Sequence, residues 1–432
     1  MVKFGLPVSK IQGMLPDKKQ KDNSMRCSFI ALVLSFYPMT LTAAELSIAG
    51  RGEFYLSQTP DSEPYARPWW QKGTGQLAQQ KQFSAGPQYL VSRLDTDSAW
   101  SAQLHAQWHR APEAGFGITE GWLQYSPLPW SGYRFRSRIG YFYPSLSLEN
   151  TDIAWTSPYS SNFSAANSWI AEEIKARGVE ISLSRPGRFF HTEHSHQAVV
   201  GLFQGNDPAG SLLAWRGFAI HPYQTALGER VDFARYLSIG PGSAIPNQPS
   251  WVEPNRELDR RTGYYLGWHW LYQQTELRLY HYDNKADPLV LTNQYGWRSK
   301  FTNLALQHQW TEQLRLVAQW LRGDTQMGAD VVKADYQAWF LLVNYQANDW
   351  QGTVRYDHFW VKDRDQTPAD DNNGDGDSWT LRLAYPLTEQ LSSALEYSIV
   401  SSSQANRAQW AGWPVEFSQR SLRFTLTYQF AL

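Results

Sequence analysis

The last twelve residues of the chain alternate strictly between apolar and polar or small positions. Every second residue of this segment is apolar, namely Leu422, Phe424, Leu426, Tyr428, Phe430 and Leu432. Successive side chains of a β-strand point to opposite faces of a sheet. This period of two therefore predicts a strand with one apolar face.

Similar alternating segments recur from Leu46 to the end of the chain, most clearly at 100–109, 263–272 and 379–385. In several of them an aromatic residue stands at each end of the apolar face, with aliphatic residues between. This profile is typical of a strand surface that faces lipid across a bilayer.

The connections between these segments alternate between short and long. Short connections include 273–274 and 311–312, and long ones include 57–87 and 144–177. Outer-membrane β-barrels have short periplasmic turns and long extracellular loops. The order of the connections therefore indicates such a barrel, with both ends of the mature chain in the periplasm.

The direction of the strands constrains their number. The segments 214–221 and 263–272 both run inward in this arrangement, so an outward strand is needed between them, and 230–239 is the best candidate. Including it gives 18 strands, with 16 as the alternative. We therefore predict an all-β fold, a transmembrane antiparallel β-barrel formed by residues 45–432 as one domain.

The composition agrees with a barrel better than with membrane helices. The chain has 21 Trp, 23 Tyr and 20 Phe, yet its mean hydropathy is −0.50. A barrel strand buries only alternate residues in lipid and carries aromatic residues at the membrane interfaces, which reconciles the two values. The net charge of −1 gives no reason to expect nucleic acid as a partner.

The N-terminal segment has the features of a secretory signal peptide. An apolar stretch runs from Cys27 to small residues that end at Ala44, and basic residues precede it. We expect residues 1–44 to be an extension and a cleaved signal peptide, with translation starting at Met1 or Met25. Because Cys27 is the only cysteine, the mature chain would form no disulfide.

Charged residues on the alternating segments predict a polar lumen. Arg134, Arg136 and Arg138 alternate with apolar residues, and placing an arginine toward lipid costs up to ~2–4 kcal/mol near the membrane midplane. The same argument places further arginines and carboxylates inside, namely Arg51, Arg278, Arg315, Arg355, Arg382, Arg423, Glu53, Glu120, Glu180, Glu276, Asp357 and Glu396. The excess of arginine favours anionic solutes. Alternatively, these charges pair with one another and hold the barrel's shape.

One long connection is expected to contain a short helix. Ser164 is suited to cap its start, and Gly178 to end it. This helix either folds into the channel as a constriction or packs on the outer rim. The residues that would form the constriction are Ser164, Trp169, Glu172, Glu173 and Lys175.

A second long connection resembles the first half of a calcium-binding loop. Asp371, Asn373, Asp375 and Asp377 offer oxygen ligands at the right spacing. The glutamate expected at the twelfth position is replaced by Arg382. The alternative is a hydrophilic outer loop without metal, and we expect no other cofactor.

The chain resembles bacterial outer-membrane porins, most closely the alginate-export-like barrels and their uncharacterised porin relatives. The segments 164–180, 370–385 and 422–432 carry this resemblance. It implies 18 strands and, for the alginate exporter, an arginine-rich channel for an anionic polysaccharide. One departure is that Leu432, not an aromatic residue, ends the chain, and Phe430 lies two positions earlier.

The predicted function is a non-enzymatic porin or channel for passive diffusion of small hydrophilic, anionic solutes. Export of an alginate-like polysaccharide is the first alternative, and a barrel enzyme or an adhesin is the second. We expect the protein in the bacterial outer membrane after export by its signal peptide. Its expected partners are outer-membrane lipid, lipopolysaccharide, the barrel-assembly machinery that reads the C-terminal strand, and anionic solutes or acidic saccharides.

Overall fold

The computed structural model describes residues 44–59, 63–78, 82–109 and 115–432. The predicted extension and signal peptide, residues 1–44, lie outside the described residues except for Ala44, which begins the first strand. The described residues belong to one compact unit. None of the helices in these ranges is long and apolar enough to cross a membrane.

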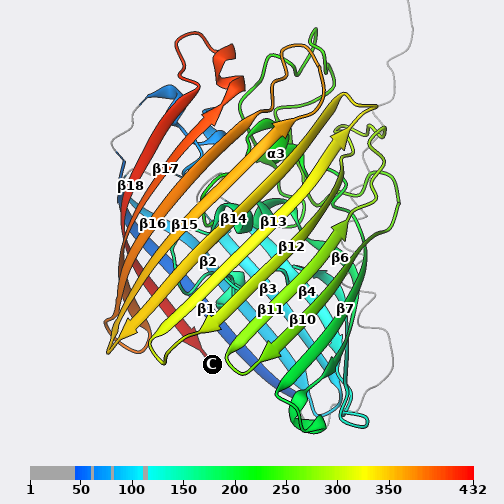
Figure 1. The fold of residues 1–432 in the computed structure, drawn as a ribbon, viewed down its shortest axis with the longest axis vertical. Helices are drawn as coiled ribbons and strands as arrows, with labels where there is room; N and C mark the ends of the chain where they lie inside the picture. Colours follow the sequence, from blue (N-terminus) through cyan, green and yellow to red (C-terminus); the bar gives the residue numbers. More distant parts are fainter. Residues whose placement is uncertain (1–43, 60–62, 79–81, 110–114) are drawn as a thin grey trace, which may run out of the picture. The chain divides into compact units, whose positions relative to one another are not determined.

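Sixteen antiparallel strands of the described chain form a closed barrel (Figure 1). Barrel strands that follow one another along the chain are hydrogen-bonded neighbours in the sheet, and β1 pairs with β18 to complete the ring. The first eight barrel strands are β1 (Ala44–Gln58), β2 (Gln82–Thr96), β3 (Trp100–His109), β4 (Gly115–Tyr125), β5 (Arg134–Phe142), β6 (Ala176–Arg185), β7 (His194–Gln204) and β10 (Gly263–Tyr272). The other eight are β11 (Thr275–Asp283), β12 (Arg298–Gln309), β13 (Leu314–Met327), β14 (Val332–Ala347), β15 (Trp350–Asp363), β16 (Gly374–Pro386), β17 (Leu391–Gln404) and β18 (Glu416–Ala431).

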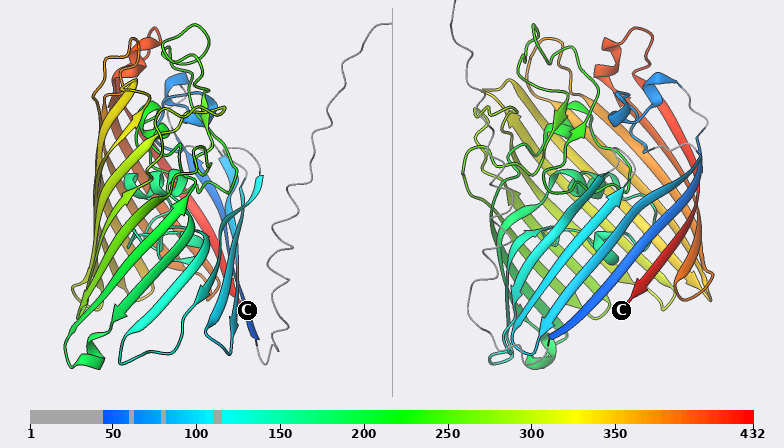
Figure 2. Two further views of the ribbon diagram at one scale, coloured as in Figure 1. Left: turned by 90° about the vertical axis from the view of Figure 1, so that its right-hand side faces the viewer. Right: turned by 180° about the vertical axis from the view of Figure 1, so that it is seen from behind.

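The remaining elements lie in the connections between these strands. They are the helices α2 (Ala165–Glu173) and α3 (Ser211–Trp215), the short strands β8 (Val231–Asp232) and β9 (Trp251–Val252), and the 3-10 turns η2 (Pro64–Ala66), η3 (Trp69–Gln71), η4 (Ile153–Trp155), η5 (Gly187–Phe190) and η6 (Ala405–Gln409). Short turns gather at the end of the barrel where the C-terminus lies, and long loops gather at the other end (Figure 2). These ends are called the short-turn end and the long-loop end below.

The outer face of the barrel is apolar, as the alternation of the sequence predicts. In β18, Leu422 and Phe424 are 43% and 42% exposed, whereas Arg423 between them is 3% exposed. Exposed leucines, isoleucines and valines recur on most of the other strands. Soluble proteins rarely expose an apolar surface of this extent, so the band is suited to contact lipid.

Aromatic pairs border this apolar band on neighbouring strands. Trp100 of β3 packs against Tyr125 of β4, with ring centroids 4.9 Å apart. Trp350 and Tyr385 form a similar pair, with centroids 4.8 Å apart. Both pairs lie at the short-turn end, where aromatic rings of membrane barrels meet the membrane interface.

The prediction of 18 strands is wrong, and the alternative count of 16 is confirmed. Neither 214–221 nor 230–239 forms a barrel strand. Both belong to the connection 205–262, because β7 pairs directly with β10 through partners such as Phe203 and Gly263. This connection contains α3, β8 and β9, and most of its apolar residues are buried, among one another and against other loops and strands, instead of facing outward.

The core of the described unit lies inside the barrel. Trp169 and Ile170 of α2 pack against inward-facing aromatic residues of the strands, including Tyr265, Phe301 and Tyr336. A second cluster joins Trp215 of the connection 205–262 to other apolar residues of the loops. The lumen predicted to be lined by polar residues therefore also holds an apolar core, because long loops fold into it and supply apolar partners.

Candidate functional site: the loop-filled barrel interior

The connection 143–175, between β5 and β6, enters the barrel and contacts strands on several sides. Near its start, Arg278 of β11 donates a hydrogen bond to the carbonyl of Ser147 over 2.9 Å. Farther along, Asp152 pairs with Arg51 of β1 over 2.8 Å. Because β1 and β11 lie far apart in the ring, this loop spans the interior.

The helix α2 lies within this loop and is buried over its full length. Its start is as expected, since the Ser164 side chain accepts a hydrogen bond from the backbone N–H of Asn167 over 3.3 Å. The helix ends at Glu173 instead of continuing toward Gly178, because Ala176 already begins β6. Its side chains thus occupy the barrel interior and not the outer rim.

Arg355 of β15 is the most heavily bonded contact between this loop and the barrel wall. Its guanidinium pairs with Glu149 of the loop over 2.7 Å and with Asp357 of its own strand over 2.8 Å. It also donates hydrogen bonds to the carbonyls of Asn162 and Phe163 over 2.8 and 3.0 Å. Both Arg355 and Glu149 are fully buried, at 0% exposure, so the pair is shielded from water.

A second connection, 205–262, docks on α2 through buried charges. Glu172 pairs with Arg216 over 2.6 Å and lies 3.0 Å from Nε2 of His221. The Arg216 guanidinium stacks over the Trp69 ring, with 4.4 Å between Cζ and the ring centroid. Three connections therefore fill the barrel interior, namely 143–175, 205–262 and the one that contains the segment 63–78. Together they are called the interior plug below.

Glu173 joins α2 to the start of α3. Its carboxylate accepts hydrogen bonds from the backbone N–H groups of Gly210 and Leu212, over 3.0 and 3.1 Å, and from Nε1 of Trp169 over 2.5 Å. Burial raises the pKa of Glu173 to about 7, although these donors favour the charged form. The carboxyl group is consequently poised to titrate near neutral pH.

The docking of the connection 205–262 should weaken as pH rises through 7. The pKa of Glu173 is raised in the docked state, so docking is strongest below its ordinary value of 4.5 and loses stability as the group ionises. The rate of amide hydrogen exchange of residues 206–216 should therefore be higher at pH 8 than at pH 5. This comparison is made after the rates are divided by the intrinsic exchange rates of the unfolded chain at each pH. Glu173→Gln should reduce this dependence and leave the part due to Asp207, whose pKa burial also raises to about 7, whereas Glu193→Gln in a short turn should not change it. An unchanged profile in Glu173→Gln would contradict the assignment.

Several charged residues predicted to line the lumen form ion pairs with one another. This agrees with the alternative interpretation, in which these charges hold the shape of the barrel. Arg51 pairs with Glu53 over 2.7 Å, and Arg278 pairs with Glu276 over 2.7 Å. The remaining ion pairs are Arg138 with Glu180 and Arg355 with Asp357, while Glu120 lies 3.4 Å from Nδ1 of His105. In these pairs the charge of each arginine is largely neutralised within the wall.

Five of the predicted arginines form no ion pair with the described residues, namely Arg134, Arg136, Arg315, Arg382 and Arg423. Arg423 donates to the side-chain oxygen of Asn162 over 3.1 Å, and Arg382 donates to Gln351 over 2.8 Å. Arg315 donates to Tyr159 over 2.9 Å. The Glu396 carboxylate binds the loop through the backbone N–H of Ser161 over 2.6 Å.

The other predicted constriction residues are inside as well. The ammonium group of Lys175 donates to the carbonyl of Thr225 and lies 4.6 Å from the centroid of the Tyr143 ring. Burial lowers its pKa to about 7. Sequence reasoning missed Glu149, Asp152 and Arg216, because irregular loops have no period that tells which side chains meet the wall.

The residues of the predicted calcium loop occupy two different environments. Asp371 and Asn373 lie in the connection between β15 and β16 and bond to each other over 2.7 Å. Asp377 belongs to β16, where its carboxylate is hydrogen-bonded to Tyr356 and, over 2.9 Å, to His358. Asp377 would have to leave these partners to bind an ion, and the calcium site stays a prediction.

Solved structures that superpose with TM-scores above 0.5 support the architecture. No protein-family model matches the chain, and no curated protein matches it in sequence. Among solved structures, outer-membrane-expressed OmpT of Vibrio cholerae superposes with a TM-score of 0.51 at 9% identity, covering 90% of this chain and 98% of that one. A loop L8 deletion mutant of the same OmpT gives 0.51 at 7% identity, covering 90% and 100%. The outer-membrane channel DcaP of Acinetobacter baumannii gives 0.49 at 7% identity, covering 90% and 97%.

The chain has the fold of an outer-membrane β-barrel. At identities this low, the likeness concerns the fold alone. The resemblance to alginate-export-like barrels stays a prediction, and the ring of 16 strands departs from the 18 strands that it implied.

Proposed function

We propose that the protein is an outer-membrane channel for passive diffusion of small hydrophilic, mainly anionic solutes. The observation that carries this proposal is a closed ring of 16 strands with an apolar outer face and a charged inner face. Barrels of 16 to 18 strands are wide enough to leave an aqueous channel. The apolar band would contact outer-membrane lipid and lipopolysaccharide, and β18 would be read by the assembly machinery.

The loops inside the barrel supply the proposed constriction. The connections 143–175 and 205–262 cross the interior and are held by three ion pairs, of which Glu172–Arg216 and Glu149–Arg355 are buried and Asp152–Arg51 is partly buried. A channel narrowed in this way favours small solutes over a polymer. We therefore rank the export of an alginate-like polysaccharide below diffusion of small molecules, and we propose no enzymatic activity.

The proposed preference for anions rests on the unpaired arginines. Arg134 and Arg136 lie at the start of β5, at the short-turn end, and no carboxylate of the described chain pairs with them. The neighbouring Arg138 and Arg278 are paired with Glu180 and Glu276, so the unpaired positive charge of this region lies on Arg134 and Arg136. Charged linings select the opposite ion, which makes this part of the wall the proposed selectivity region.

Reversal potentials in a planar bilayer under a KCl gradient test this proposal. The wild-type channel should conduct in discrete steps and prefer chloride. Arg136→Glu should lower the chloride-to-potassium permeability ratio by about a factor of two or more, because it replaces an unpaired positive charge with a negative one. Arg136→Lys keeps the charge and should leave the ratio unchanged.

Two results would contradict the proposal. A purely silent barrel would remove the channel function, and a clear cation preference of the wild-type channel would remove the preference for anions.

A further inference from the structure

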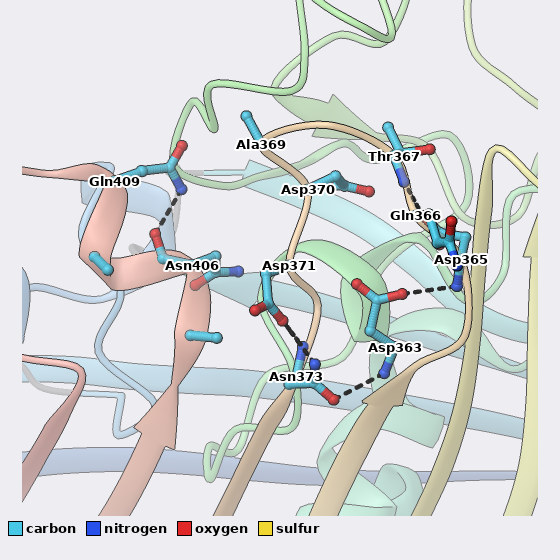
Figure 3. Close-up of a pocket in the computed structure, with 12 residues that line it drawn as sticks. Asp363, Asp365, Gln366, Thr367, Ala369, Asp370, Asp371, Asn373, Asn406 and Gln409 are labelled. Atoms are coloured by element: carbon cyan, nitrogen blue, oxygen red, sulfur yellow. Dashed lines mark hydrogen bonds between the residues drawn. The ribbon is translucent and has the colours of Figure 1, made fainter.

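A cavity of about 600 Å³ lies at the long-loop end, between the β15–β16 connection and the turn η6 (Figure 3). Four aspartates line it, namely Asp363, Asp365, Asp370 and Asp371. The other polar lining residues are neutral, and they include Asn406 and Gln409 of η6. Among the described residues that line this cavity, none is a lysine, an arginine or a histidine. Its size is typical of sites for small molecules.

Two oxygen atoms at this cavity lack the hydrogen-bond donors that buried acceptors normally have. Asp370 is only 6% exposed. Its Oδ1 accepts a hydrogen bond from Ser238 over 2.8 Å, but its Oδ2 has no partner. The side-chain oxygen of Asn406 is also buried without a partner. A buried acceptor left unpaired is costly, so these atoms point to a ligand that brings N–H donors.

The aspartates are arranged for an extended cation and not for a single metal ion. A calcium ion needs six to eight oxygen ligands at 2.3–2.6 Å, so its carboxylates must converge. Among the described residues, three acidic groups converge within 4.8 Å of one another only at Asp207, Glu257 and Asp259, outside this cavity. Figure 3 shows Asp371 and Asp363 on two sides of the cavity, with Asp370 between them.

The lining also argues against a quaternary ammonium ligand. Such ligands are recognised by aromatic cages through cation–π contacts. The residues that line this cavity include no aromatic side chain. Carboxylate and amide oxygens instead form charge-assisted hydrogen bonds with ammonium N–H groups. The chemistry therefore favours primary or secondary amines.

We propose that this cavity binds a linear polyamine, a chain carrying two or more protonated primary or secondary amino groups. One ammonium group is held by Asp370 Oδ2 and a second by Asp371 or Asp363, with Asn406 of η6 as a further oxygen acceptor. This site lies apart from the arginines of β5 and does not depend on the proposed preference of the channel for anions.

Isothermal titration calorimetry with spermidine, on the full-length protein folded in detergent, tests this proposal. Spermidine should bind saturably to the wild-type protein. The double variant Asp370→Asn/Asp371→Asn should bind about tenfold or more weakly, because it removes two charged acceptors of ammonium hydrogen bonds. Asp349→Asn removes the same charge in a short turn at the other end of β15 and should bind as the wild type does.

A second variant with a smaller change keeps the proposal testable if the double variant does not fold. Asn406→Ala removes one acceptor oxygen without a change of charge and should weaken spermidine binding about threefold. Heat-modifiable migration on a gel checks that each variant is folded. The proposal is overturned if the folded variants bind spermidine as tightly as the wild type, if tetramethylammonium binds equally well, or if calcium binds this cavity and spermidine does not.

Discussion

Replacing residues 205–262 with a four-residue Gly-Ser turn should produce a barrel that still assembles and conducts far more current. The strands that flank this connection are already hydrogen-bonded neighbours, with Phe203 opposite Gly263. A turn of two to five residues is a normal connection for such a hairpin. Because the deletion removes one of the three connections that fill the interior, single-channel conductance should rise about threefold or more.

A change of similar kind elsewhere on the rim provides the control for this deletion. Residues 328–331 connect β13 to β14 at the same end of the barrel. Replacing them with a Gly-Ser turn should leave the conductance close to that of the wild type. If the conductance of the 205–262 deletion were also unchanged while the barrel was folded, this loop would not be part of the constriction.

Arg355→Met should release the connection 143–175 from the wall of the barrel. The substitution leaves Glu149 and Asp357 buried without their partner. Breaking a buried pair in this way costs about 3–5 kcal/mol, because an uncompensated charge remains in the interior. The unfolding midpoint in denaturant should fall, and a protease added to the folded protein should cut within 143–175.

Two further variants separate the effect of charge from the effect of lost volume. Arg364→Met removes an arginine whose pair with Asp335 is exposed at the rim, and it should change stability by less than about 1 kcal/mol. Combining Arg355→Met with Glu149→Gln and Asp357→Asn removes the orphaned charges and should restore part of the stability. No recovery in this triple variant would show that packing, not charge, holds the loop.

The alternation of the sequence predicted the barrel wall because one physical rule governs every strand. A residue of the wall faces either lipid or the interior, so Phe424 and Arg423 must alternate, and their exposure differs accordingly. The same rule placed Arg136 on the inner side of β5. The cap at Ser164 was also predictable, since it depends only on residues within one turn of the helix.

The contents of the barrel were not predictable by the same rule. Apolar residues such as Trp215 and Phe233 suggested two more strands, but their apolar partners are mainly other residues of the long loops. A period of two cannot distinguish burial in lipid from burial in a plug. The contact between Glu149 and Arg355 joins residues 206 positions apart, and no local pattern reports such a contact.

Asp152 has a consequence for the way the molecule is assembled. Its carboxylate binds Arg51 of β1 over 2.8 Å and Gln429 of β18 over 2.9 Å. These two strands form the seam, where the first and last strands of the ring meet and where the chain provides no hairpin to join them. The loop between β5 and β6 thus bridges the seam from within, and Asp152 can make both contacts only when β1 and β18 are paired in this register.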